Sequence, residues 1–315
     1  MKKANIKASG FIIATTMLII LSTGCVNYEF SRNSSTIENL ENLYMLASEG
    51  DVYAQNMLAE IYFFNEHDSQ AAVYWFEKAA EQGHDMAQFN LGSIYREGIG
   101  IAQDYDQAMY WFLRAAEQEQ AMSQFSLGMI YFYGRGVPQD FEQAMYWFRR
   151  AAEQGFAEAQ NNLGRMYDEG HGVSQNYEQA IYWYRRSADQ GNAIAERNLG
   201  LVYNIGLGVA QNHEQAAYWF RKASIQGDPS SQQHLGLLYE DGKGVVQNYE
   251  QAVYWYRRSA EQGYANAQTN LGLMYQKGLG VQQSYAQAAY WYRRAAEQGE
   301  PFAQGNLFTL PAQYR

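Results

Sequence analysis

Hydrophobic and polar positions recur along most of this chain with one period of 36 residues. Every tryptophan follows that period, at Trp75, Trp111, Trp147, Trp183, Trp219, Trp255 and Trp291. Within a period, apolar residues fall at the i, i+4, i+7 and i+8 spacing of one helical face, as at Ala159, Leu163, Met166 and Tyr167. A second helical pattern surrounds each tryptophan. Repetition at such a period predicts stacked helix pairs, in which each pair buries its apolar face against its neighbours.

Each repeat is predicted to hold two helices, which we call helix A and helix B. In the unit 156–191, helix A ends at Gly170-His171-Gly172, because glycine adopts the left-handed conformation that ends a helix. Helix B begins at Asn176, an N-cap residue, and Gln179 completes a capping-box pattern. The same N-cap is predicted at Asp68, Asp104, Asp140, Asn212, Asn248 and Ser284.

A glycine recurs in the middle of helix A, at Gly92, Gly128, Gly164, Gly200, Gly236 and Gly272. A glycine inside a helix costs about 1 kcal/mol relative to alanine. Its repetition at one position therefore predicts that helix B approaches closely there. The large tryptophan and tyrosine side chains of helix B are expected to fill the space beside these glycines.

The first and last units depart from the pattern, as the ends of an array must. Leu58-Ala59 replaces Leu-Gly in the first unit, and the last unit stops soon after Leu307-Phe308. We predict an all-α fold, an α/α solenoid that forms a right-handed superhelix of about seven 36-residue helix-turn-helix repeats, over residues 37–315. The predicted units are 51–83, 84–119, 120–155, 156–191, 192–227, 228–263 and 264–299, with a partial unit at 300–315.

The first 24 residues follow a different pattern. Three lysines within residues 1–10 precede an apolar run of 11 residues at 11–21, and small residues then lead to Cys25, the only cysteine. A basic start, a short apolar core and small residues are typical of a secretory signal, and membrane spans need about 20 apolar residues. We predict that residues 1–24 are a signal peptide. The alternative is a buried N-terminal helix with an incidental cysteine.

The residues around Cys25 resemble the cleavage site of a bacterial lipoprotein. Thr23-Gly24-Cys25 fits the lipobox, although Ser22 stands where leucine is usual. The resemblance implies that Cys25 carries a lipid anchor and becomes the mature N-terminus, with 25–36 as a polar tether to the folded array. Val26, rather than aspartate, implies sorting to the outer membrane, on its periplasmic or its surface face.

The repeat resembles the Sel-like repeat, a relative of the tetratricopeptide repeat. The matching motifs, over about residues 40–310, are A-x-x-x-L-G in helix A, G-x-G-V in the loop and A-x-x-W-x-x-x-A-A-x-x-G in helix B. The resemblance implies a superhelix whose concave surface binds proteins, with scaffold or adaptor roles and mostly without catalysis. Some secreted members, stapled by cysteine pairs, are linked to β-lactam binding. This chain lacks those cysteines, so that property is not transferred.

Charge and motifs exclude several classes of function. The formal net charge is −10, and it becomes −13 without residues 1–24, which disfavours a nucleic-acid partner. No nucleophile motif or phosphate-binding loop appears, and the histidines lack the spacing of metal ligands. We therefore predict no enzyme activity, no cofactor and no metal site. We interpret the five histidines as scattered surface or loop residues, with a metal site across units as the alternative: His67, His84, His171, His213 and His234.

Paired basic residues recur in helix B, at Arg149/Arg150, Arg185/Arg186, Arg221/Lys222, Arg257/Arg258 and Arg293/Arg294. We predict that one member of each pair forms an ion pair with an acid of the previous unit, such as Glu178 or Glu214. The alternative is a basic stripe that binds an anionic partner.

Positions that vary between units are candidates for recognition. The position before the helix A leucine is mostly asparagine, whose amide can bond either a bound peptide backbone or a neighbouring helix. The residues Asn90, Asn162, Arg165, Asn198, His234 and Asn270 are our candidates for partner binding.

Together these features predict a non-enzymatic protein–protein interaction scaffold or adaptor of the bacterial cell envelope. It would bind a protein or peptide partner on its concave helix A face and attach to the membrane through the N-terminal lipid. One alternative is an enzyme acting on peptidoglycan or β-lactams, which needs a non-repeated nucleophile or a carboxylate pair. Another is a passive structural spacer, which predicts a featureless concave face.

Overall fold

The computed structural model describes residues 34–65 and 67–315, so the predicted signal peptide and Cys25 lie outside the described residues. The described residues form sixteen α-helices and a short 3-10 turn. Their bounds are α2 Ser34–Ser48, α3 Val52–Phe64, α4 Ser69–Glu81, α5 Asp85–Glu97, α6 Tyr105–Glu117, α7 Ala121–Tyr133, α8 Phe141–Glu153, α9 Ala157–Glu169, α10 Tyr177–Ala188, α11 Ala193–Ile205, α12 His213–Ile225, α13 Pro229–Asp241, α14 Tyr249–Glu261, α15 Ala265–Lys277, α16 Tyr285–Ala296, α17 Pro301–Thr309 and η1 Ala312–Tyr314.

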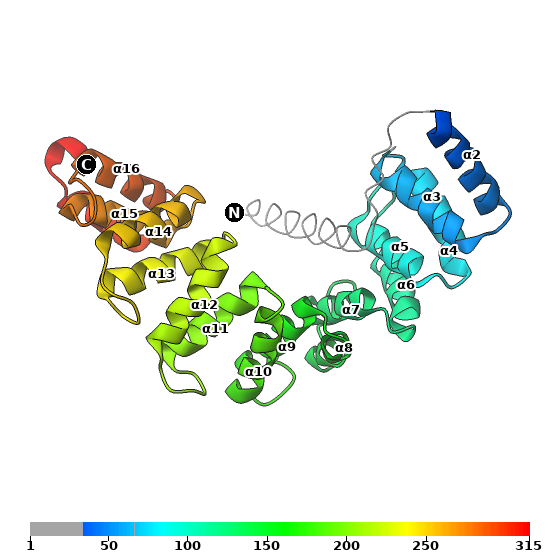
Figure 1. Cartoon of the computed structure of the whole chain (residues 1–315), viewed down its shortest axis with the longest axis horizontal. Coiled ribbons are helices and arrows are strands. Elements are labelled where there is room, and N and C mark those ends of the chain that lie inside the picture. Colours follow the sequence, from blue (N-terminus) through cyan, green and yellow to red (C-terminus); the bar gives the residue numbers. More distant parts are fainter. Residues whose placement is uncertain (1–33, 66) are drawn as a thin grey trace.

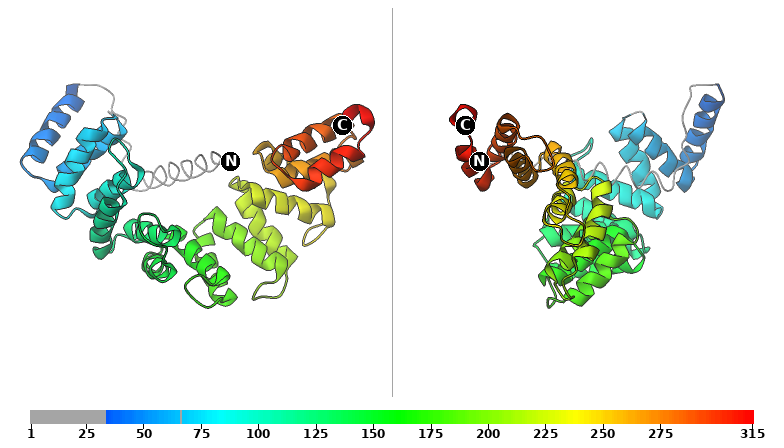
Figure 2. Two further views of the ribbon diagram at one scale, coloured as in Figure 1. Left: turned by 180° about the vertical axis from the view of Figure 1, so that it is seen from behind. Right: turned by 60° about the vertical axis from the view of Figure 1, so that its left-hand side comes forward.

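The helices stack in pairs, and the predicted all-α solenoid is confirmed. Odd-numbered helices from α3 to α15 are helix A, and each packs against the helix B that follows it. The pairs follow one another along an open arch, and in its middle α7 and α9 lie toward the hollow side (Figure 1). Helix α2 and the C-terminal turn lie at opposite ends of this arch (Figure 2). Helix α2 begins at Ser34, within the segment 25–36 that the sequence assigned to the tether.

The predicted start of helix B is confirmed at every unit. The side chain of Asn176 accepts the backbone N–H of Gln179 at 3.0 Å, and the other predicted caps make the same bond. The reciprocal bond of the predicted capping box, from the backbone N–H of the N-cap residue to the glutamine side chain, is wrong. That N–H group donates to another acceptor. In α10 it donates to the carbonyl of Tyr167 at 2.8 Å, which joins helix A to helix B across the glycine loop.

The helix A glycines lie beneath aromatic rings of helix B, as their repetition predicted. A Cβ atom added to Gly164 would lie 2.7 Å from the ring of Tyr184, and one added to Gly200 would lie 2.5 Å from Phe220. Both distances are shorter than any real Cβ contact, so an alanine here requires the ring or the helix to move. The ring belongs to the residue after each tryptophan, and it is buried in every pair: Phe76, Phe112, Phe148, Tyr184, Phe220, Tyr256 and Tyr292.

A line of buried glutamines joins successive pairs. Gln160 in α9 donates its side-chain amide to the carbonyl of Ala152 in α8 at 3.0 Å. Its own carbonyl oxygen accepts the amide of Gln190, just beyond α10, at 2.8 Å. We call this arrangement the glutamine relay, and equivalent bonds occur at Gln88, Gln124, Gln232 and Gln268. Each relay satisfies buried polar groups and fixes one pair against the next.

Glu196 in α11 replaces the relay glutamine and is fully buried. Its carboxylate accepts the amide of Gln226 at 2.8 Å and lies 2.9 Å from the ammonium group of Lys222. A carboxylate has no N–H group to donate, so the bond that a glutamine makes to the preceding helix B is absent at this unit.

Candidate partner-binding surface

The predicted recognition residues lie on one side of the array but make different contacts. Five of them share one position of helix A and are half-buried: Asn90, Asn162, Asn198, His234 and Asn270. The amide of Asn162 donates to the carbonyl of Glu158 in its own helix at 2.9 Å. The amide of Asn198 donates to Asn161 of the neighbouring α9 at 3.0 Å. At Asn198 the geometry therefore agrees with the neighbouring-helix alternative, and partner binding stays a prediction for the whole set.

Arg165, the sixth predicted residue, belongs to a cluster between two helix pairs. Its guanidinium lies 4.6 Å from the ring centre of Phe132. Its Nε atom is 3.8 Å from the carboxylate of Glu169. The ring of His171 stacks on Phe141 with centres 4.5 Å apart and also meets the edge of Phe132. These five residues fill the space between α7/α8 and α9/α10, and we call them the filled junction.

The same positions two repeats later carry different residues. Asn204 replaces Phe132, His213 replaces Phe141, and Lys243 replaces His171. Leu237 and Asp241 stand in place of Arg165 and Glu169. We call these five residues, between α11/α12 and α13/α14, the open junction.

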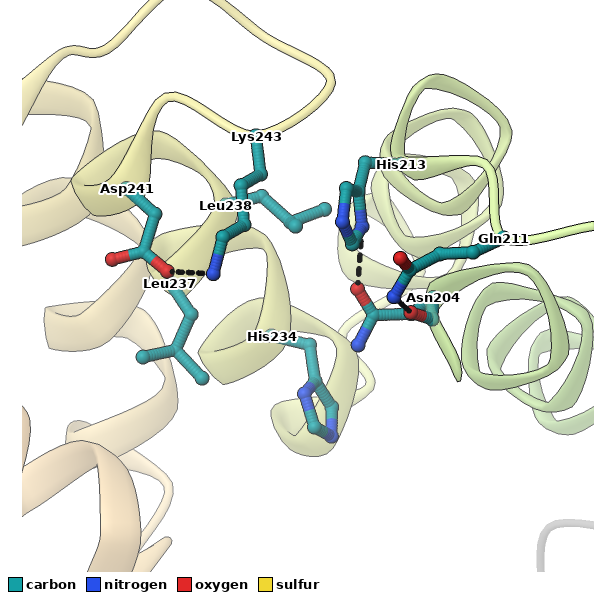
Figure 3. A pocket seen from close by; sticks show the side chains of 8 residues that line it. All are labelled: Asn204, Gln211, His213, His234, Leu237, Leu238, Asp241 and Lys243. Atoms are coloured by element: carbon teal, nitrogen blue, oxygen red, sulfur yellow. Dashed lines mark hydrogen bonds and ion pairs between the residues drawn. The ribbon is translucent and has the colours of Figure 1, made fainter. Parts of the chain in front are cut away.

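The open junction contains a cavity of about 420 Å³. Figure 3 shows His213, Asn204 and Gln211 on one side of it and Lys243, Asp241 and Leu237 on the other. His234 and Leu238 of α13 also line it. An amide and an imidazole line this cavity at the positions that two phenyl rings occupy in the filled junction.

Polar groups around the cavity are paired with one another. The Nδ1 atom of His213 lies 3.1 Å from the side-chain oxygen of Asn204, and Lys243 is 2.8 Å from Asp241. His234 stacks flat on Phe220 with ring centres 5.0 Å apart. Burial lowers the pKa of His234 below its ordinary value.

Two of the five histidines therefore line the same cavity, a grouping that the sequence interpretation missed. His213 and His234 were treated as scattered surface residues, but both line the open junction. Aligning the five junction positions of each unit in register would have shown that the phenyl groups of Phe132 and Phe141 are replaced by an amide at Asn204 and an imidazole at His213.

Comparison with known proteins identifies the repeat. The Sel1 repeat family model matches seven successive segments: 52–84, 85–119, 121–156, 157–192, 193–228, 229–264 and 265–300. The chain belongs to the Sel1 repeat family. Sel1 repeats mediate protein interactions, and no enzyme family is found.

Solved Sel1 structures are similar to this chain over most of its length. One is c5321, a protective antigen present in uropathogenic Escherichia coli strains, which is 41% identical over 84% of this chain with a TM-score of 0.81. The match covers 58% of c5321, so this chain spans little more than half of that protein. Another is a Sel1 repeat protein from Oxalobacter formigenes, which is 33% identical with a TM-score of 0.74, covering 89% of this chain and 82% of that one. No curated protein matches the chain.

The paired arginines of the Sel1 units contact tyrosines rather than the predicted acids. Arg149 donates to the hydroxyl of Tyr167 in the next helix A at 2.9 Å, and Arg185, Arg221 and Arg257 make equivalent bonds. Arg150 donates to Tyr146 of its own helix. The predicted pairing with an acid of the previous unit occurs at Arg150, which pairs with Glu119, whereas the named acids Glu178 and Glu214 do not appear among the described ion pairs. Tyrosine hydroxyls reach the guanidinium groups because the next helix A lies beside them.

The basic positions form two ion pairs with other acids. Arg150 pairs with Glu119, and Lys222 pairs with the buried Glu196. Glu119 has a positive φ of 63° and stands where the other units have glycine. Within residues 34–65 and 67–315, no group of three or more His, Cys, Asp or Glu side chains is placed to hold a metal ion. In the same residues, no helix is long and apolar enough to cross a membrane.

Proposed function

We propose that this Sel1 repeat protein is a non-catalytic adaptor of the bacterial cell envelope that binds a protein partner along its helix A face. The observation that carries the proposal is the contrast between constant and variable positions. The caps, glycines and relay glutamines repeat from unit to unit, whereas the residues at the junctions differ. Repeat proteins use such variable positions on an extended surface for recognition.

The N-terminal sequence supports attachment of this adaptor to a membrane. Cys25 ends the lipobox-like segment, and a lipid on it would hold the array at the outer membrane, on the periplasmic or the surface face. A single acyl chain gives weak anchoring, and the two- or three-chain modification of a lipoprotein cysteine would give stable anchoring. The relative described as a protective antigen supports a location that the host encounters.

A crosslinking pull-down from intact cells tests the proposal. The first variant removes three helix A side chains, Asn162→Ala, Asn198→Ala and His234→Ala. A matched control removes three exposed helix B acids, Glu178→Ala, Glu214→Ala and Glu250→Ala. We expect a discrete protein that the wild type and the helix B control capture and that the helix A variant loses.

A second comparison uses Cys25→Ser, which removes the lipidated thiol. We expect this variant to leave the membrane fraction and to lose or misplace the captured partner. Recovery of only peptidoglycan, or of nothing above background from the wild type, would contradict the adaptor proposal. A wall-binding or spacer role would then replace it.

A further inference from the structure

We propose that the open junction is a binding pocket for an aromatic side chain of the protein partner, with tyrosine as the best fit. This inference rests on the proposed function in one respect, because the ring is assigned to a protein partner. The pocket itself is argued from the two junctions and is tested without that partner.

The filled junction indicates which group the cavity fits. There the chain supplies the rings of Phe132 and Phe141, with an imidazole stacked at 4.5 Å and an interplanar angle of 18°. At the open junction these ring positions hold Asn204 and His213, and a cavity of about 420 Å³ remains beside Leu237 and Leu238. A flat apolar ring from outside would restore contacts that the filled junction makes internally.

The position of Asn204 favours a ring that carries a hydroxyl group. In three other pairs this position holds a hydrogen-bond acceptor, and helix B supplies a tyrosine hydroxyl to it. Tyr184 donates to Asp168 at 3.1 Å, Tyr256 to Glu240 at 2.6 Å and Tyr292 to Gln276 at 2.7 Å. The pair α11/α12 keeps the acceptor, as Asn204, but helix B supplies Phe220, which has no hydroxyl. The Asn204 oxygen already lies 3.1 Å from His213 Nδ1, and its second lone pair can accept the hydroxyl of a partner tyrosine.

The histidines of the pocket also suit a neutral ring. Burial lowers the pKa of His234, which favours the uncharged imidazole, and its ring already stacks on Phe220 at an angle of 13°. Lys243 is neutralised by Asp241 at 2.8 Å. The pocket therefore has little net charge to attract an acidic side chain, and Leu237, Leu238 and the stacked imidazole of His234 offer contacts to an aromatic one.

The test is an NMR titration of histidine-labelled protein with N-acetyl-L-tyrosine amide. The chain has five histidines, and two of them line the pocket. We expect saturable shifts of the His213 and His234 signals, with His67, His84 and His171 unchanged as internal controls. The phenylalanine amide should bind about fivefold more weakly, because it lacks the hydroxyl.

Two variants test which side chains make the pocket selective for an aromatic ring. Asn204→Phe introduces the residue of the filled junction and should abolish the shift at His234 while thermal unfolding by circular dichroism shows an intact fold. Lys243→Leu introduces the residue found at Leu207 and Leu279 and should leave tyrosine binding within about twofold, since an ammonium group adds little to a neutral ring.

Three results would overturn the inference. The first is no saturable shift at His213 and His234. The second is an equal response to N-acetyl-L-leucine amide, which would show a pocket without preference for rings. The third is a stronger response to N-acetyl-L-glutamate amide that Lys243→Leu removes, which would show a carboxylate site. If the pocket fails to bind N-acetyl-L-tyrosine amide while the array still captures its partner, this inference is refuted and the proposed function stands.

Discussion

The filled junction and the open junction occupy the same place two repeats apart, and they differ only in side chains. At the first, Phe132, Phe141, Arg165, Glu169 and His171 pack against one another. At the second, Asn204, His213, Leu237, Asp241 and Lys243 surround a cavity. The caps, the helix A glycines and the buried aromatic rings are the same around both. The array therefore keeps its framework constant, and small changes at a few junction positions convert a packed region into a pocket.

The largest expected effect comes from opening the filled junction. Phe132→Asn removes a buried ring and places an amide among Phe141, Phe148 and Arg165, so we expect a loss of about 3 kcal/mol or more in the free energy of unfolding. Urea denaturation followed by circular dichroism measures it, with hydrogen exchange in α7–α9 to localise the change. The reverse change, Asn204→Phe, fills an existing cavity and serves as the control. Equal destabilisation by both changes would contradict the claim that one junction is packed and the other has room for a ring.

An intermediate effect comes from the ion pair between Lys222 and the buried Glu196 in the helix pair α11/α12. Lys222→Met leaves the carboxylate of Glu196 without its cation, and we expect a loss of about 2 kcal/mol in stability. This value lies below the roughly 3 to 5 kcal/mol typical of fully buried pairs, because Lys222 is partly exposed. Adding Glu196→Gln restores the residue of the other pairs and should recover most of the loss in a double-mutant cycle. Additive effects of the two changes would contradict a direct interaction.

The smallest expected effect is a pH dependence from His234 in the open junction. Because burial lowers the pKa of His234, the unfolded state binds more protons than the folded state below about pH 6.5. The stability contribution is therefore complete above that pH, and it is lost as the pH falls toward the folded-state pKa. We expect His234→Asn to flatten the stability curve between about pH 7 and 5 by less than about 1 kcal/mol. Asn162, at the same position in the filled junction, does not titrate, so Asn162→Ala is the control for that slope.

Much of the framework could be predicted from the sequence because its signals are local and repeated. The caps at Asp104 and Asn176 and the glycines at Gly164 and Gly200 each act on neighbouring turns or on one recurring ring, and the structure has them where the sequence placed them. The same signals recur from unit to unit, and this recurrence makes each assignment firm.

The interactions between pairs could not be predicted in the same way. Arg149 in α8 bonds Tyr167 in α9, and the glutamine relay joins Gln160 in α9 to the carbonyl of Ala152 in α8. Such bonds depend on how one pair sits on the next, and a glutamine in a polar sequence carries no sign of burial. The open junction combines three helices, so its cavity depends on ring volumes compared across units, and no single motif carries that information.

Glu196 has a mechanical consequence for the whole array. Elsewhere a relay amide fastens each pair to the helix B before it, as Gln160 does to Ala152, and these links resist relative rotation of the pairs. At Glu196 that bond is missing, so the step between α9/α10 and α11/α12 lacks one link that the relay glutamines make elsewhere in the described solenoid. Bending or torsion applied along the arch should concentrate there, one helix pair before the open junction. A partner that spans this step would change the curvature of the array at small elastic cost.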